Sequence, residues 1–211
     1  MANEPIRGIL GEAVKGKIGV LIEDHFDQTE FRKFNAFFPE RGYQVVYLSH
    51  LWGNSELTFG SNPDEGYVEE HVIVSTEINT VQPEDFKGIL LIGAYATDRL
   101  RYQANPCKGQ PNMAPAVVFL RKAVATANLK IGTICHSLWL FCADSTLLQG
   151  RKVTCAHNII CDVENAGAEV VFDGDQTADL VVDGNLISGK HPAITDRLME
   201  NFLAEIEKAV S

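Results

Sequence analysis

The chain has 211 residues, of which 45% are hydrophobic and 22% charged, so it is long enough for one well-buried core and short for two. Its 28 Asp and Glu outnumber its 18 Lys and Arg, which argues against a nucleic acid or an anionic membrane surface as the partner. The N-terminal residues lack the basic start and apolar run of a secretory signal, and no stretch approaches the ~18 apolar residues of a membrane-spanning helix, so we expect a cytoplasmic protein.

Five cysteines are present, an odd number without a spaced framework, so reduced thiols are the default expectation. Three nearby residues, Cys155, His157 and Cys161, could be considered as metal ligands. Their spacing matches no standard zinc pattern, so neither a metal nor another cofactor is expected.

The N-terminal part of the chain predicts a short arm followed by ordered structure. Residues 1–16 are polar and contain three glycines, which indicates a flexible arm, and a single domain is expected over 17–211. Residues 18–22 form a continuous apolar run typical of a central parallel strand. Three phenylalanines at helical spacing, Phe31, Phe34 and Phe38, then predict a helix that is capped near Thr29 and ended or kinked by Pro39.

The rest of the chain alternates strand-like and helix-like patterns, which predicts a mostly parallel sheet with helices on both faces. We therefore expect an α/β fold with three layers. The predicted strands are 43–49, 87–92, 130–134 and 151–154, with an antiparallel excursion over 68–74 and a hairpin over 181–187. Helices are predicted from Pro115, over 159–166 and near 198–210. Residues 51–64 predict a loop or hairpin, and residues 103–114 a loop long enough to cover something.

One stretch points to chemistry, because the strand over 130–134 stops at Cys135 and an apolar, helix-like run begins near Ser137. A strand that turns directly into a helix is the geometry of a nucleophile elbow, with small residues such as Thr133 and Ser137 on either side. The N–H groups and positive dipole end of that helix would stabilise a thiolate and lower the pKa of Cys135. The alternative is an inert cysteine, since free cysteines are often buried and behave as small hydrophobes.

Three predicted strands end at segments with reactive or polar residues: 23–30, 93–98 and Cys135. In open parallel sheets, ligands bind beyond the carboxyl ends of the strands. We expect these segments to meet there and form a site.

Several motifs resemble those of the ThiJ/PfpI superfamily, which has the class I glutamine amidotransferase-like, flavodoxin-like fold. The segment Thr133-Ile134-Cys135-His136-Ser137 resembles the family's Ala-Ile-Cys-His-Gly, and residues 92–101 stand in place of Pro-Gly-Gly-x-x-Pro-Glu-x-x-Arg. Segments 150–154, 164–168 and 181–187 are similar to the family's closing segments. The resemblance extends from about residue 17 to about residue 206, and these motifs are specific for the fold and weak for the substrate.

The resemblance implies that Cys135 is the nucleophile and that Glu30 is the acid approaching it, with Asp27 as the alternative acid. A protonated Glu30 could donate a hydrogen bond to the thiolate, which predicts a raised pKa for Glu30 and a lowered one for Cys135. Backbone N–H groups of Ala94 and His136 would form the oxyanion hole. Ala94, which follows Gly93, replaces the family's second glycine and would be strained if that position needs a positive φ.

His136 could act as the general base, although neighbouring side chains rarely point at one another. In family members with this Cys-His pair, an acid from a neighbouring subunit is thought to orient the histidine, and Asp98 occupies its place. A triad of Cys135, His136 and Asp98 would then require a homo-oligomer. His157 is the rival base.

The predicted function is a cysteine-dependent hydrolase or lyase that acts on a small carbonyl, amide or peptide substrate through a covalent intermediate at Cys135. The alternative is a non-enzymatic, redox-sensing or chaperone-type stress protein whose Cys135 is reversibly oxidised. Cys107, in the long loop, could serve as a resolving thiol. A glutaminase subunit is disfavoured because no downstream His-x-Glu pair is present.

Overall fold

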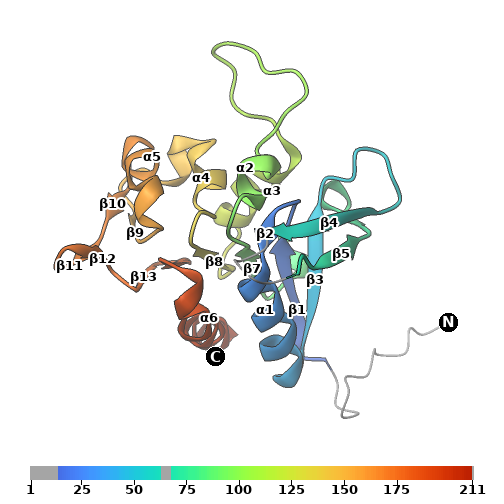
Figure 1. Cartoon of the computed structure of the whole chain (residues 1–211), viewed down its shortest axis with the longest axis horizontal. Coiled ribbons are helices and arrows are strands. Elements are labelled where there is room, and N and C mark those ends of the chain that lie inside the picture. Colours follow the sequence, from blue (N-terminus) through green and yellow to red (C-terminus); the bar gives the residue numbers. More distant parts are fainter. Residues whose placement is uncertain (1–13, 63–67, 211) are drawn as a thin grey trace.

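The computed structural model describes residues 14–62 and 68–210. Its centre is a seven-stranded sheet in the order β13-β14-β8-β7-β1-β3-β6 (Figure 1). All neighbouring strands run parallel except β13 and β14, which form an antiparallel hairpin. The predicted mostly parallel α/β architecture is therefore confirmed. The strands are β1 (Gly16–Leu21), β3 (Tyr43–Ser49), β6 (Thr76–Glu77), β7 (Gly88–Leu91), β8 (Lys130–Ile134), β13 (Leu180–Asp183) and β14 (Leu186–Gly189).

The helices flank this sheet in two groups, as in flavodoxin-like folds. Helices α1 (Gln28–Glu40) and α6 (Thr195–Val210) pack against each other, and α6 also packs on β8 and β14. Phe38 and Phe202 join these two helices with an edge-to-face ring contact of 6.2 Å between centroids. The second group, in which successive helices contact one another, comprises α2 (Ala96–Leu100), α3 (Pro115–Ala125), α4 (Trp139–Cys142) and α5 (Ile160–Asn165).

Short strands lie outside the main sheet. The predicted antiparallel excursion is confirmed, because β4 (Leu57–Asn62) pairs antiparallel with β5 (His71–Val74), and β4 also pairs with β2 (Phe26–Asp27). Two small pairs follow β8: β9 (Lys152–Val153) with β10 (Glu169–Val170), and β11 (Phe172–Asp173) with β12 (Gln176–Thr177).

The start of the chain differs in detail from the sequence prediction. Strand β1 already begins at Gly16, within the arm predicted over 1–16, and residues 1–13 of that arm lie outside the described residues. The cap of α1 is Asp27 rather than Thr29, because the Asp27 carboxylate accepts the backbone N–H of Glu30 at 2.9 Å. Pro39 lies in the last turn of α1, which ends at Glu40.

The loop between α2 and α3 projects away from the body of the molecule and does not lie over it (Figure 1). Its residues 103–111 are almost all exposed, which includes Cys107. Two side chains close its base: Asn112 donates to the carbonyl of Arg101 at 2.9 Å, and Gln103 accepts the N–H of Met113 at 2.8 Å. The prediction that this loop covers something is therefore wrong for the chain by itself.

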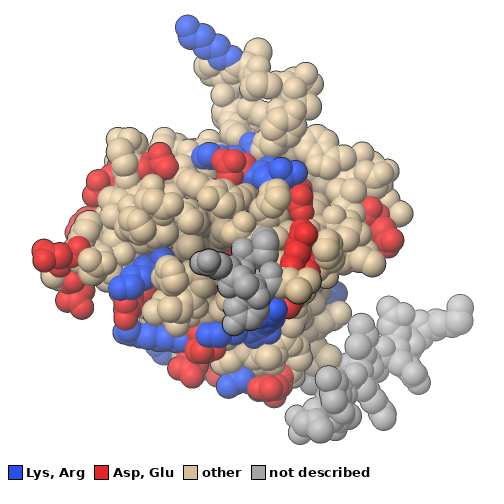
Figure 2. Space-filling model, viewed as in Figure 1, with Lys and Arg blue, Asp and Glu red and all other residues tan. Residues whose placement is uncertain are grey.

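Acidic and basic side chains are interspersed on the face shown in Figure 2. Among the described residues, no helix combines the length and apolar character needed to cross a membrane.

Gly132 on β8, in the middle of the sheet, has no free space for a side chain. A Cβ atom there would lie 2.4 Å from Cδ2 of Leu90 and 3.1 Å from Cδ2 of Phe202. The glycine thus lets the β7 side chain and the α6 ring pack directly on the backbone of the strand that leads to Cys135.

Gly132→Ala should destabilise the protein by about 1–3 kcal/mol, because the added methyl group overpacks the core. Denaturant unfolding followed by circular dichroism measures the loss. Leu90→Ala removes the closest atom, so the double variant should lose less than the sum of the two single variants. Strict additivity would contradict this packing explanation.

Candidate active site

Three adjacent strands, β1, β7 and β8, end at the proposed site, as predicted from the sequence. Gly93 and Ala94 follow β7, Cys135 follows β8, and Glu30 lies in the first turn of α1, after β1 and β2. Because parallel strands present their carboxyl ends at one edge of the sheet, these residues come together although they are far apart in the sequence.

Cys135 lies on a strained turn directly after β8. Its φ is +57°, in the left-handed region that residues other than glycine rarely adopt. The turn is held from both sides: the N–H of Cys135 donates to the carbonyl of Gly189 at 3.0 Å, and Ser137 Oγ accepts the N–H of Ile134 at 2.6 Å. A positive φ at the cysteine and a small buried residue two positions later are the geometry of a nucleophile elbow.

The helix after the elbow begins later than predicted, at Trp139 rather than near Ser137. Residues 135–138 form turns, and α4 begins at Trp139 and ends at Cys142. A helix of one turn has few aligned peptide dipoles, so little positive charge stands at its start to stabilise a thiolate.

His136 points at the neighbouring thiol. Its Nδ1 lies 3.3 Å from Sγ of Cys135, and its Nε2 lies 2.9 Å from Oδ1 of Asn158. With the amide oxygen accepting the Nε2–H, Nδ1 carries a lone pair toward the thiol, as a general base requires. The ring stacks on Trp139 and Tyr95, with centroids 4.9 and 5.9 Å away, which fixes its plane.

The surroundings of His136 favour its neutral form. Burial lowers its pKa, the hydrogen bond to Asn158 raises it, and the nearby His157 and His191 lower it further. A neutral imidazole can accept the thiol proton at neutral pH.

The backbone N–H groups of Ala94 and His136 both act to lower the pKa of Cys135. Ala94 adopts a φ of +56°, so the residue that replaces the family's glycine is indeed in the left-handed region. It is kept there by a bridge to Phe26 and by the adjacent hydrogen bond from the N–H of Tyr95 to the carbonyl of His25, 3.0 Å long.

Glu30 is completely buried beside the elbow. Its Oε2 accepts the N–H of Gly93 at 2.6 Å, and its Oε1 has no hydrogen-bond partner among the described residues. Both oxygens and the Cβ of Cys135 lie within 3.1 Å of the point where a Gly93 Cβ would stand, so only glycine fits between them. Burial raises the pKa of Glu30 well above its usual range, as predicted, and the nearby Asp27 charge raises it further. The hydrogen bond from Gly93 lowers the pKa but is outweighed.

The predicted lowering of the Cys135 pKa is wrong. Burial is the largest cause of a raised pKa, and the charges of Glu30 and Asp27 raise it further. The N–H groups of Ala94 and His136 act in the opposite direction and are outweighed. The resting nucleophile is therefore a thiol next to a neutral imidazole.

The remaining predicted residues lie elsewhere or have other contacts. Asp27 caps α1. Asp98, on α2, is exposed and forms an ion pair with Arg101, while Asn158 of the same chain contacts His136 Nε2. His157 is exposed, and within the described structure it is His136 that contacts the sulfur.

The segment considered for a metal does not form a ligand cluster. Cys155 is buried and Cys161 is exposed, and the described part of the chain contains no group of three or more His, Cys, Asp or Glu side chains that could hold a metal ion.

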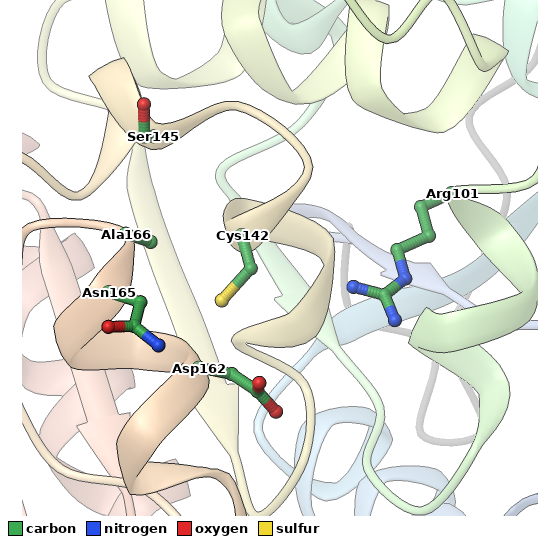
Figure 3. A pocket seen from close by; sticks show the side chains of 6 residues that line it. All are labelled: Arg101, Cys142, Ser145, Asp162, Asn165 and Ala166. Atoms are coloured by element: carbon green, nitrogen blue, oxygen red, sulfur yellow. The ribbon is translucent and has the colours of Figure 1, made fainter. Parts of the chain in front are cut away.

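A cavity of about 310 Å³ lies between the end of α2, α4 and α5 (Figure 3). Arg101 reaches toward it from the end of α2, and Cys142 on α4 points its thiol into it. Its wall is tied to the site through Trp139, whose Nε1–H donates to Asp162 at 2.9 Å. Ser145, Asp162, Asn165 and Ala166 complete the lining.

Comparison with known proteins places this geometry in a family. The model of the DJ-1/PfpI family matches residues 16–205. The chain belongs to the DJ-1/PfpI family. Its relatives include Protein/nucleic acid deglycase 2 of Escherichia coli, 32% identical over 76% of this chain and 85% of that protein, and the Bacillus subtilis protein named "Putative cysteine protease YraA", 30% identical over 83% and 89%.

A solved structure from Anabaena variabilis shows the same fold. It is a two-domain protein with DJ-1/ThiJ/PfpI-like and ferritin-like domains, and it superposes with a TM-score of 0.74 at 23% identity. The match covers 92% of this chain and 48% of that longer one.

The sequence interpretation missed Asn158 and Tyr95. Asn158 directly follows His157, and a lone amide beside a histidine is not a recognisable sequence signal. Tyr95 lies in the predicted strand-end motif, where a half-exposed aromatic residue beside a reactive pair was the available signal.

Glu30→Gln should lower the pKa of Cys135 by about one unit, because it removes a buried negative charge beside the sulfur. Glu30 is ionised at the high pH where the thiol titrates, so its removal stabilises the thiolate. The pH dependence of Cys135 alkylation by iodoacetamide, followed by mass spectrometry, should shift to lower pH. A shift to higher pH would show instead that a protonated Glu30 donates to the thiolate.

Proposed function

We propose that the protein is a cysteine-dependent hydrolase that cleaves a C–N bond at an oxygen-bearing carbon of a small substrate. The observation that carries this proposal is the 3.3 Å contact between Cys135 Sγ and His136 Nδ1 on a nucleophile elbow. The names of the two relatives, a deglycase and a cysteine protease, support it, because both describe the removal of an amine from such a carbon.

For an amide substrate, His136 Nδ1 accepts the thiol proton as Cys135 sulfur bonds to the carbonyl carbon, and the C=O electron pair moves onto oxygen. Collapse of this adduct breaks the C–N bond, and His136 returns the proton to the departing amine. Water then attacks the thioester, His136 accepts a proton from it, and the C–S bond breaks. The same proton finally returns to the sulfur, so the thiol is regenerated.

The N–H groups of Ala94 and His136 suit the stabilisation of the oxyanion. They already act to lower the pKa of the Cys135 thiol, and they belong to backbone fixed by the ends of β7 and β8. Cys135 is only 7% exposed, which favours a small or extended substrate over a folded protein surface.

The same site argues against the redox-sensing alternative. Sensor cysteines are accessible and have low pKa values. Burial raises the pKa of the Cys135 thiol, and Cys135 is only 7% exposed.

All five cysteines are free thiols in the structure, which supports our proposal that the protein works in the reducing cytoplasm. Self-association and the absence of nucleic-acid or membrane partners remain predictions from the sequence.

Cys135→Ala should reduce kcat/KM by about 10³-fold or more, because the nucleophile is lost. The substrates are a panel of aminoacyl 4-nitroanilides and methylglyoxal-modified N-acetyllysine. Cys142→Ala is the matched control, since its thiol faces the neighbouring cavity, and it should retain activity. Wild-type protein that turns over no member of the panel, or an active Cys135→Ala variant with normal circular dichroism, would overturn the proposal.

A further inference from the structure

Asn158 contacts the side of His136 that faces away from the nucleophile. The amide belongs to a short 3₁₀ turn, His157–Ile159, of the same chain, and its Oδ1 lies 2.9 Å from His136 Nε2. This is the position in which the sequence predicted an acid from another subunit.

The segment that carries Asn158 is fastened to the backbone of the nucleophile. The N–H of Ala156 donates to the carbonyl of Cys135 at 3.1 Å, and the N–H of Ile159 donates to the carbonyl of Ala156 at 3.1 Å. The hydroxyl of Thr177 holds the carbonyl of Cys155 at 3.1 Å. Asn158 is therefore held in a fixed relation to the residue whose base it contacts.

We propose, on the basis of the function proposed above, that Asn158 is the positioning residue that holds His136 in its Nε2–H form, so that one protomer contains the complete relay of Cys135, His136 and Asn158. The amide oxygen accepts the Nε2–H and leaves Nδ1 as the acceptor of the thiol proton. Because the amide carries no full charge, it orients the ring without strongly stabilising the imidazolium. The proton is then readily passed on to the leaving amine.

Among the described residues, Asn158 is the side chain that contacts His136 Nε2. The rings of Tyr95 and Trp139 lie beside the His136 ring, with centroids 5.9 and 4.9 Å away. The nearby titratable groups that act on the pKa of His136 are His157 and His191. Asp98 is held by Arg101 on the surface of α2. Burial, the largest cause, lowers the pKa of His136 and so favours its neutral form.

The experiment compares Asn158→Ala, Asn158→Asp and the control Asp98→Asn by the pH dependence of kcat/KM. Asn158→Ala should lower kcat by about 10- to 100-fold with little change in KM, because the base is no longer held in place. Asn158→Asp should be more active than Asn158→Ala, but the acidic limb of its kcat/KM profile should lie about one unit higher in pH than in wild type. The reason is that a carboxylate stabilises the imidazolium, whereas His136 must be neutral to act as a base. Asp98→Asn should stay within about two-fold of wild type.

A second measurement needs no substrate. NMR of protein labelled with ¹⁵N-histidine distinguishes the two neutral tautomers, and His136 should be in the Nε2–H form in wild type and lose this preference in Asn158→Ala. Equal losses of activity in Asp98→Asn and Asn158→Ala, or unchanged pH profiles and tautomers in both Asn158 variants, would overturn the inference. If Cys135→Ala is inactive in that case, the proposed function still stands. If the wild-type protein turns over no substrate, the proposed function fails, and the tautomer of His136 alone then decides the inference.

Discussion

The hydrogen bond from the N–H of Ile134 to Ser137 Oγ is the contact on which the site depends. It closes the turn after β8 at 2.6 Å and thereby keeps Cys135 at a φ of +57°, which an unsupported chain avoids. Strand β8 lies between β7 and β14, so the hydrogen bonds at the centre of the sheet hold the backbone that leads into the strained turn. A cysteine in a relaxed conformation would not present its sulfur to the His136 ring and the two N–H groups at once.

Burial determines where the protons are in the resting site. It disfavours charge on all three titratable groups: the pKa values of Glu30 and Cys135 are raised, and that of His136 is lowered. A buried site of this kind holds neutral partners at rest and develops charge only during the reaction. Electrostatic help is then directed to the transition state, where fixed N–H groups stabilise charge without reorganisation.

The sequence sufficed to predict the sheet, the elbow and the meeting of three strand ends, because each rests on a local pattern that the core enforces. It did not predict the sign of the Cys135 pKa shift, which depends on burial and on how soon α4 ends. It also did not predict Asn158, since that residue reaches His136 through the hydrogen bond between Ala156 and Cys135, a contact between distant segments. The direction of the 103–114 loop was likewise beyond local patterns, because loops of turn residues pack with few contacts.

The closed base of that loop makes it a separable appendage. Asn112 and Gln103 tie its two ends together with their own side chains, so helices α2 and α3 are anchored in the same way whatever lies between them. Chain length beyond a closed neck costs little entropy, and exposed tips accept insertions. The segment around Cys107 is therefore a natural attachment point for a fluorophore or an epitope, because it projects from the body of the molecule (Figure 1) and carries its own exposed thiol for labelling.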